Sequence, residues 1–212
     1  MKDLVSIITP CYNSADFIEE TIQSVLNQTY TNWEWLITDD LSKDNTVEII
    51  RKYNPKNILE VGTLYGYSAI LMAAAASDIL HEDRKVVTIE IDRSIADIAR
   101  KNVAAAGLSE KINVIFGDAL EVIPKLDWKF DLLFLDAAKS EYLTYLKLAE
   151  DKALKRGAVI VADNIEVSKN EMLDYLKYVR SSGGIYKSET IETTLEFTPN
   201  VRDAIEVSIK VT

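Results

Sequence analysis

Acidic and amide side chains stand where two apolar runs end in the second half of the chain. Asp136 follows the run LLFL, and Asp163 and Asn164 follow the run AVIVA. Two carboxylates and an amide carbonyl from neighbouring strand ends can converge on a hard cation. The spacing therefore predicts a site for Mg²⁺ or a similar divalent cation at Asp136, Asp163 and Asn164. The structural alternative is that both aspartates cap the helices that follow them.

A glycine-rich loop closes an earlier apolar run and opens a helix. Glycines let the backbone approach a ligand, and a helix N-terminus offers free N–H groups to a carboxylate. The loop predicts a cofactor site, and its candidate residues are Glu60, Gly62, Thr63, Gly66, Tyr67 and Ser68. The alternative is a tight strand-to-helix turn without a ligand.

The next two strand ends carry further acidic residues. Glu90 ends the run TIE and can accept hydrogen bonds from two ribose hydroxyls. Asp118 and Ala119 end the following run, where an adenine edge would lie. Each carboxylate alone is better read as a helix cap, but three strand ends in order favour a nucleoside site.

Regular alternation of apolar runs and helical periodicity places these residues on a sheet. We expect helices near 66–78, 93–106, 119–125, 141–154 and 168–181, and a final antiparallel pair of strands near 186–192 and 204–211. The strands before that pair are expected at Asn57–Val61, Val86–Ile91, Ile112–Phe116, Asp131–Leu135 and Ala158–Ala162. Strands alternating with helices predict an α/β fold, a Rossmann-like doubly wound sheet that is mostly parallel with a terminal antiparallel strand.

With these motifs in place, residues 56–212 resemble the class I S-adenosylmethionine-dependent O-methyltransferases, in particular the catechol and caffeoyl-CoA group. The resemblance implies that Asp136 serves the cofactor as well as the metal, and that Lys139 is the general base. It implies transfer of the sulfonium methyl group to a hydroxyl of a small catechol-like acceptor that the metal grips. A homodimer is plausible by the same resemblance. Glu192 and Glu196 are nearby candidates for acceptor contacts, without a motif to choose between them.

The first 52 residues carry a different pattern. A predicted β-α-β-α unit has Thr-Pro-Cys-Tyr-Asn after its first strand and Asp39-Asp40 after its second, with a second helix over Asn45–Lys52. These motifs resemble the nucleotide-binding opening of family-2 glycosyltransferases, whose later Asp-x-Asp metal motif has no counterpart here. We therefore expect a glycosyltransferase-like segment at 1–52 and a methyltransferase domain at 53–212.

Two alternatives to an active methyltransferase stay open. One is an engineered or recombined chimera that folds, with or without binding S-adenosylmethionine, but does not turn over, because the segment 1–52 stands where related enzymes carry covering helices. The other is a nucleotide-sugar-binding remnant. Binding of uridine diphosphate that depends on Asp39 would favour the latter.

Composition limits the remaining function classes. The net charge is −10, of which the first 52 residues contribute −5 with 4 basic and 9 acidic side chains, so nucleic acid and anionic membranes are not expected partners. Cys11 and His81 are the only residues of their kinds, which excludes thiolate clusters and Ser-His-Asp chemistry. No leader or spanning run is apparent, and we expect a soluble, cytoplasmic protein.

Overall fold

The structure, a computed structural model, describes residues 5–30, 33–39, 57–77, 85–181, 184–195 and 198–211. The chain divides into two compact units, one comprising Met1–Pro55 with Asp78–His81 and the other Lys56–Ser77 with Glu82–Thr212. The predicted helix over 45–52 lies outside the described residues, as do His81 and Glu196.

The first unit contains two parallel strands joined by a helix. Strand β1 (Val5–Cys11) pairs along its full length with β2 (Trp33–Asp39), and α1 (Ala15–Leu26) connects them. The helix begins after Ser14, whose carbonyl accepts hydrogen bonds from the backbone N–H groups of residues 17 and 18. Its apolar side chains recur at helical spacing and are buried, as the sequence predicts, at Ile18, Ile22 and Val25.

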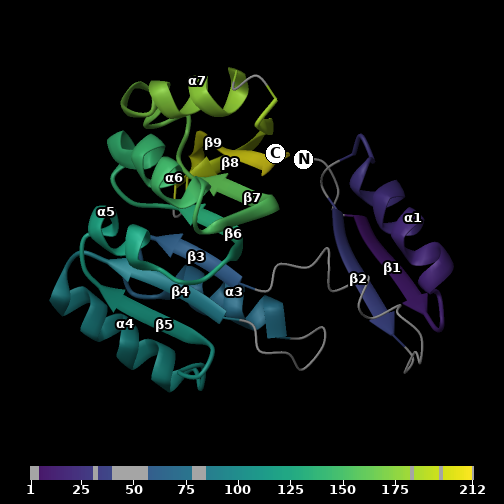
Figure 1. The fold of residues 1–212 in the computed structure, drawn as a ribbon, viewed down its shortest axis with the longest axis horizontal. Helices are drawn as coiled ribbons and strands as arrows, with labels where there is room; N and C mark the ends of the chain where they lie inside the picture. The colour runs from purple at the N-terminus through teal and green to yellow at the C-terminus, as the bar shows by residue number, and fades with distance from the viewer. Residues whose placement is uncertain are drawn as a thin grey trace. The chain divides into compact units, whose positions relative to one another are not determined.

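The second unit is built on a sheet of seven strands in the order β5-β4-β3-β6-β7-β9-β8 (Figure 1). The strands are β3 (Asn57–Val61), β4 (Lys85–Glu90), β5 (Ile112–Phe116), β6 (Phe130–Leu135), β7 (Leu154–Ala162), β8 (Tyr186–Leu195) and β9 (Thr198–Lys210). The first five pair in parallel, whereas β9 pairs antiparallel with both β7 and β8. The predicted Rossmann-like sheet with its terminal antiparallel pair is therefore confirmed.

Helices cover both faces of this sheet. They are α3 (Tyr67–Ser77), α4 (Arg93–Ala105), α5 (Ala119–Val122), α6 (Tyr142–Glu150) and α7 (Leu173–Ser181), with short 3₁₀ turns η1 (Ile123–Lys125), η2 (Lys139–Glu141) and η3 (Lys169–Glu171). Helix α6 ends earlier than predicted, because β7 already begins at Leu154 and pairs there with Phe130 before a register shift.

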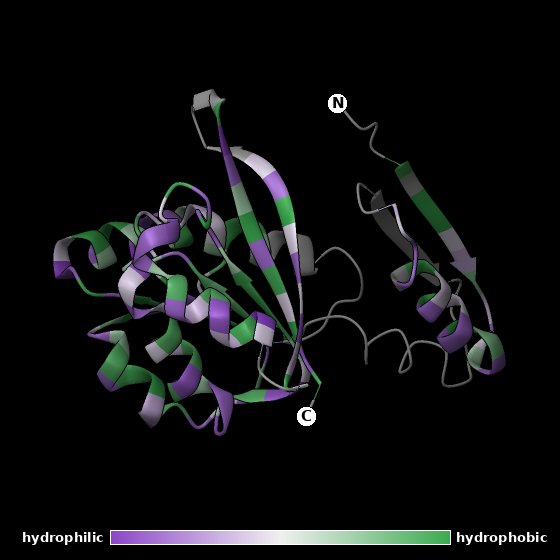
Figure 2. Ribbon diagram, turned by 90° about the horizontal axis from the view of Figure 1, so that it is seen from above, coloured by the Kyte–Doolittle hydropathy of each residue, from purple (hydrophilic) through white to green (hydrophobic). Residues whose placement is uncertain are grey.

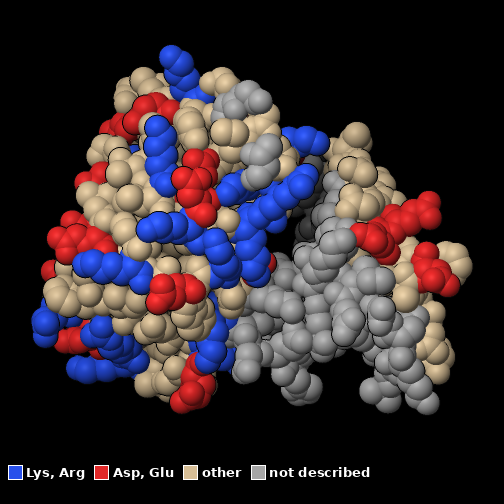
Figure 3. Space-filling model, in the orientation of Figure 1, with Lys and Arg blue, Asp and Glu red and all other residues tan. Residues whose placement is uncertain are grey.

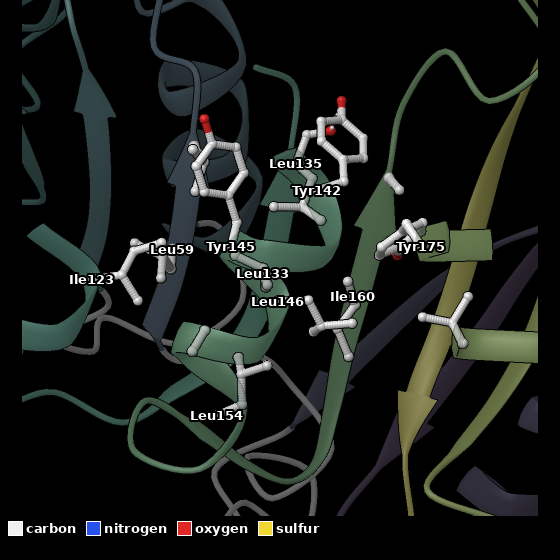
Figure 4. Close-up of a cluster of buried hydrophobic side chains, with 14 of the residues drawn as sticks. Leu59, Ile123, Leu133, Leu135, Tyr142, Tyr145, Leu146, Leu154, Ile160 and Tyr175 are labelled. Carbon is white, nitrogen blue, oxygen red and sulfur yellow. Dashed lines mark hydrogen bonds between the residues drawn. The ribbon is translucent and has the colours of Figure 1, made fainter. Parts of the chain in front are cut away.

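Successive side chains of the central strands point to opposite faces of the sheet and pack into two separate hydrophobic cores. Leu59 and Leu133 belong to a cluster with side chains of α5, α6 and α7 (Figure 4), whereas Ile58 packs with side chains of α3 and α4 on the other face. Such two-sided burial explains why these strands read as continuous apolar runs rather than alternating ones.

The β8–β9 hairpin differs from the central strands. Its two long strands carry both hydrophilic and hydrophobic residues and reach beyond the rest of the sheet (Figure 2). Acidic and basic side chains are interspersed over the face of the second unit drawn in Figure 3. Within the described ranges, no helix has the length and apolar character needed to cross a bilayer.

Candidate active site

The carboxyl ends of β3, β4, β5, β6 and β7 meet at one edge of the sheet, because these strands are parallel neighbours. Every predicted cofactor and metal residue lies within or just after one of these ends or at the start of the following helix. Ligands of open α/β sheets bind at this edge, where the strand order reverses. Here the reversal falls between β3 and β6, beside Gly62 and Asp136.

Gly62 is required by the close approach of two chain segments at this reversal. Its φ is +101°, and a Cβ placed on it would lie 2.1 Å from the backbone oxygen of Asp136. The Gly62 N–H donates to the carbonyl of Ile89, which ties the loop to β4 as well. The glycine loop therefore runs directly against the residue after β6. Gly66 also has a positive φ, but a Cβ there would meet only ordinary contacts with Ala99.

Glu60 is a buried carboxyl group under this loop. The Ser68 hydroxyl at the start of α3 donates to its Oε1, while its Oε2 is buried without a hydrogen-bond partner in the described part of the chain. Burial raises the pKa of Glu60 to about 7, and the negative charge of Asp136 acts in the same direction. An unsatisfied buried acceptor of this kind is suited to a donor supplied by a ligand.

Glu90 bridges the glycine loop and the start of α4. Its Oε2 accepts from the N–H of Leu64 at 2.9 Å, and its Oε1 accepts from the N–H of Asp92 at 3.0 Å. A carboxylate has about four acceptor positions, so two remain for other donors. The Thr63 hydroxyl lies 2.5 Å from that of Thr88, which fixes the loop from the middle of β4.

At the end of β5, Asp118 has the helix-capping role that the sequence offered as the alternative to a ligand contact. Asp118 is the N-cap of α5 and accepts from the N–H of Leu120 at 2.9 Å. Ala119 behind it is buried. Tyr67, by contrast, is exposed at the start of α3, where its ring is open to a partner or ligand.

Asp136 and Lys139 form an ion pair at the end of β6. The Lys139 Nζ donates to Asp136 Oδ1 and to the hydroxyl oxygen of Tyr142, both at 2.8 Å. The Tyr142 hydroxyl in turn donates to the carbonyl of Leu135 at 2.7 Å. Burial raises the pKa of Tyr142 above its ordinary value, with the charges of Asp136 and Asp163 adding to the effect. The tyrosine therefore stays a neutral hydroxyl that holds the amine.

Asp163 and Asn164 follow β7, the neighbour of β6. Burial raises the pKa of Asp163, and the charge of Asp136 raises it further. Neither aspartate caps the next helical segment, because the N-caps of η2 and η3 are Ala138 and Ser168. The capping alternative is thus not the arrangement found.

Two residues that sequence reasoning missed complete this part of the site. Tyr142 holds Lys139, and Asp203 of β9 accepts from the Asn164 side-chain amide at 3.0 Å. Lys139 and Tyr142 are three residues apart, a spacing that could have indicated the first contact. The second joins residues 39 apart and had no local signal. Within the described ranges, no group of three or more His, Cys, Asp and Glu side chains is placed to hold a metal ion.

Comparisons with known proteins agree on one family. A family model described as O-methyltransferase matches residues 13–171. Catechol O-methyltransferase B of Danio rerio is 32% identical over 197 residues, which cover 90% of this chain and 72% of that protein. Catechol O-methyltransferase of Mus musculus is 35% identical over 76% of this chain and 62% of that protein, so the chain spans less than two thirds of it.

A solved structure extends the likeness to the fold. The O-methyltransferase TomG from Streptomyces achromogenes, in complex with SAM, superposes with a TM-score of 0.67 at 26% identity, over 78% of this chain and 77% of that one. The family match begins at residue 13 and so takes in most of the segment for which the sequence predicts a glycosyltransferase-like origin.

Proposed function

The chain belongs to the O-methyltransferase family, and from that premise we propose that it transfers a methyl group from S-adenosylmethionine to a hydroxyl of a small catechol-like phenol. The observation that carries this proposal is the grouping of Asp136, Lys139 and Asp163 beside the glycine loop. Asp136 and Asp163 directly follow the neighbouring parallel strands β6 and β7, and Lys139 binds the first of them.

The cofactor side is supported by Glu60, Gly62 and Glu90. The unpartnered Oε2 of Glu60 suits a cationic N–H donor such as the ammonium group of S-adenosylmethionine. Gly62 puts no side chain between the loop backbone and Asp136. Glu90 retains acceptor positions for the two hydroxyls of a ribose. We assign the rest of the cofactor contact to Thr63, Gly66, Tyr67, Ser68, Asp118, Ala119 and Asp136.

The donor set at Asp136, Asp163 and Asn164 fits a divalent cation. All three supply oxygen, the ligand that Mg²⁺ prefers. Burial raises the pKa of Asp163, and the charge of Asp136 adds a smaller repulsion that a cation would relieve. A bound Mg²⁺ would supply charge stabilisation for the phenol oxygen as it loses its proton.

We assign the acceptance of that proton to Lys139. Two of the three positions around its Nζ are used by Asp136 and by Tyr142, which leaves the third for the acceptor hydroxyl. As the free amine, Lys139 would accept the proton at this position while Tyr142 and Asp136 keep the nitrogen in place.

The test combines a binding and an activity measurement. Calorimetric titration with S-adenosylmethionine should give micromolar binding, and catechol methylation, followed by chromatography, should stop on addition of EDTA and return with Mg²⁺. Asp163→Ala should remove methylation and keep cofactor binding, whereas Glu189→Gln, an exposed change on β8, should keep both. Full activity of Asp163→Ala would contradict the metal site, and absence of cofactor binding would favour the inert chimera.

We propose separately that residues 1–52 are a glycosyltransferase-like segment joined to a methyltransferase domain at 53–212. Support comes from the parallel register, which pairs Cys11 with Asp39, so that both motifs lie at the same end of the two-stranded sheet. Binding of uridine diphosphate to the whole chain, lost in Asp39→Ala, would support a retained nucleotide site. Uridine diphosphate that does not bind would leave this segment a scaffold.

A further inference from the structure

Asp203 is a buried carboxylate that contacts the candidate metal site from a distant part of the chain. It lies on β9 with 3% of its surface exposed, and its Oδ2 accepts from the side-chain nitrogen of Asn164 at 3.0 Å. A fully buried carboxylate is rare unless its hydrogen-bonding capacity is used. The other acceptor positions of Asp203 show how that capacity is filled.

The second oxygen of Asp203 accepts from the backbone. Its Oδ1 lies 2.8 Å from the N–H of Ala204, 3.2 Å from that of Glu166 and 3.3 Å from that of Val167. Together with the contact to Asn164 these are four hydrogen bonds, and Asp203 is the acceptor in each of them.

This property fixes the orientation of the Asn164 amide. Only the NH₂ side of the amide can face an acceptor-only group, so the amide oxygen is turned away from Asp203. The backbone is held in the same way, because Asn164 has a φ of +59° and the N–H of Ile165 donates to the carbonyl of Ala204 at 2.9 Å. Both the turn after β7 and the amide on it are thus set by β9.

We propose that Asp203 is a positioning residue for the divalent cation, which it serves by presenting the oxygen rather than the nitrogen of Asn164. The inference rests on the proposed metal site and adds a residue that does not itself contact the metal. Outer groups that orient metal ligands typically change metal affinity by about 10–100-fold when they are replaced.

The isosteric variant Asp203→Asn separates orientation from folding. Three backbone N–H donors surround Oδ1, so the oxygen of the introduced amide must take that position and these three hydrogen bonds are kept. Its NH₂ group then faces the Asn164 amide, which has to turn and offer its own oxygen to it. The Asn164 nitrogen would point to the cation, and nitrogen of an amide carries no free lone pair for a metal.

The experiment measures Mn²⁺ binding by the electron paramagnetic resonance signal of the free ion, on the whole chain. Asp203→Asn should weaken Mn²⁺ binding by about tenfold or more and leave binding of S-adenosylmethionine unchanged. The matched control is Glu189→Gln, which removes one negative charge from the same hairpin at an exposed position and should bind Mn²⁺ like the wild type.

Loss of charge near a cation would also weaken its binding, and a double-mutant cycle distinguishes the two causes. In an Asn164→Ala background, Asp203→Asn should have no further effect on Mn²⁺ binding, because no amide is left to orient. A full additional loss in that background would overturn the inference, as would unchanged binding in the single variant. A wild-type chain that binds no Mn²⁺ would overturn the proposed metal site itself, and this inference with it.

Discussion

The hydroxyl of Tyr142 lies 2.8 Å from the amine of Lys139 and holds it from the side of the protein core. Tyr142 is fully buried and its hydroxyl donates a hydrogen bond to the carbonyl of Leu135, so the hydroxyl cannot turn away from the amine without losing a partner. The orientation of the proposed base is thus anchored in the interior of the second unit, beneath the strand ends.

Tyr142→Phe should therefore lower turnover more than cofactor binding. The amine keeps its contact with Asp136 but loses its second anchor, and we expect kcat to fall by about tenfold, equivalent to roughly 1.4 kcal/mol. The matched control is Tyr145→Phe, on the same helix, whose hydroxyl donates to Glu141 rather than holding Lys139. Equal losses of turnover in both variants would show that the effect is one of helix stability and not of positioning.

Gly62→Ala should abolish cofactor binding. An added methyl group would overlap the backbone oxygen of Asp136, so the loop or the end of β6 has to move. Gly107→Ala is the control, because Gly107 also has a positive φ but an added Cβ there meets nothing within 4 Å. Backbone strain should cost each variant about 1–2 kcal/mol of stability, and Gly62→Ala should lose more because of the overlap. Calorimetric titration should show lost binding of S-adenosylmethionine for Gly62→Ala alone.

Glu60 should make the free protein less stable as pH rises from about 4.5 to 7. Its pKa is raised to about 7 by burial, so in this range the folded state holds a proton that the unfolded state releases. The stabilising contribution is complete below the unfolded pKa and is lost by the folded pKa, with a total of up to about 3 kcal/mol. Urea unfolding at several pH values should show this slope in the wild type, and Glu60→Gln should remove it. An unchanged slope in the variant would assign it to other groups.

Arg180→Ala should destabilise the β8–β9 hairpin. Arg180 binds both oxygens of Glu206, at 2.7 and 2.8 Å, and Glu206 is 1% exposed, so the variant leaves a buried charge. The side chain of Arg180 is itself partly exposed, and we expect a loss of about 2–3 kcal/mol rather than the larger cost of a fully buried pair. Lys125→Ala, which breaks an exposed pair with Glu121, should cost less than about 1 kcal/mol in the same unfolding experiment.

Local patterns were enough to predict most of the fold. The strands at 57–61 and 112–116 were predicted with the bounds that the structure has, because apolar runs of parallel strands are bounded by clear turn residues. The helices were placed within a few residues. The order of the strands and the register between them depend on contacts across the whole sheet and could not be read from a single run of residues.

The candidate site, like the fold, has a part that the sequence predicts and a part that it does not. Residues at the ends of successive strands were predictable, since parallel strands bring their carboxyl ends together. The contact between Asp203 and Asn164 was not predictable, because it requires knowing that β9 lies beside β7.

The strand order also has a consequence for how the site is assembled during folding. Strand β9 follows β8 along the chain but lies between β7 and β8, so β8 can join the sheet only after β9 has been made. The two strands can pair early as a hairpin, whereas the pairing of Ala162 with Glu206 closes a much longer loop and is expected to be slow. The hydrogen bond between Asp203 and Asn164 can form only in that late step. A nascent or trapped chain with β3 to β7 in place would thus hold the two aspartates before the amide beside them has been oriented.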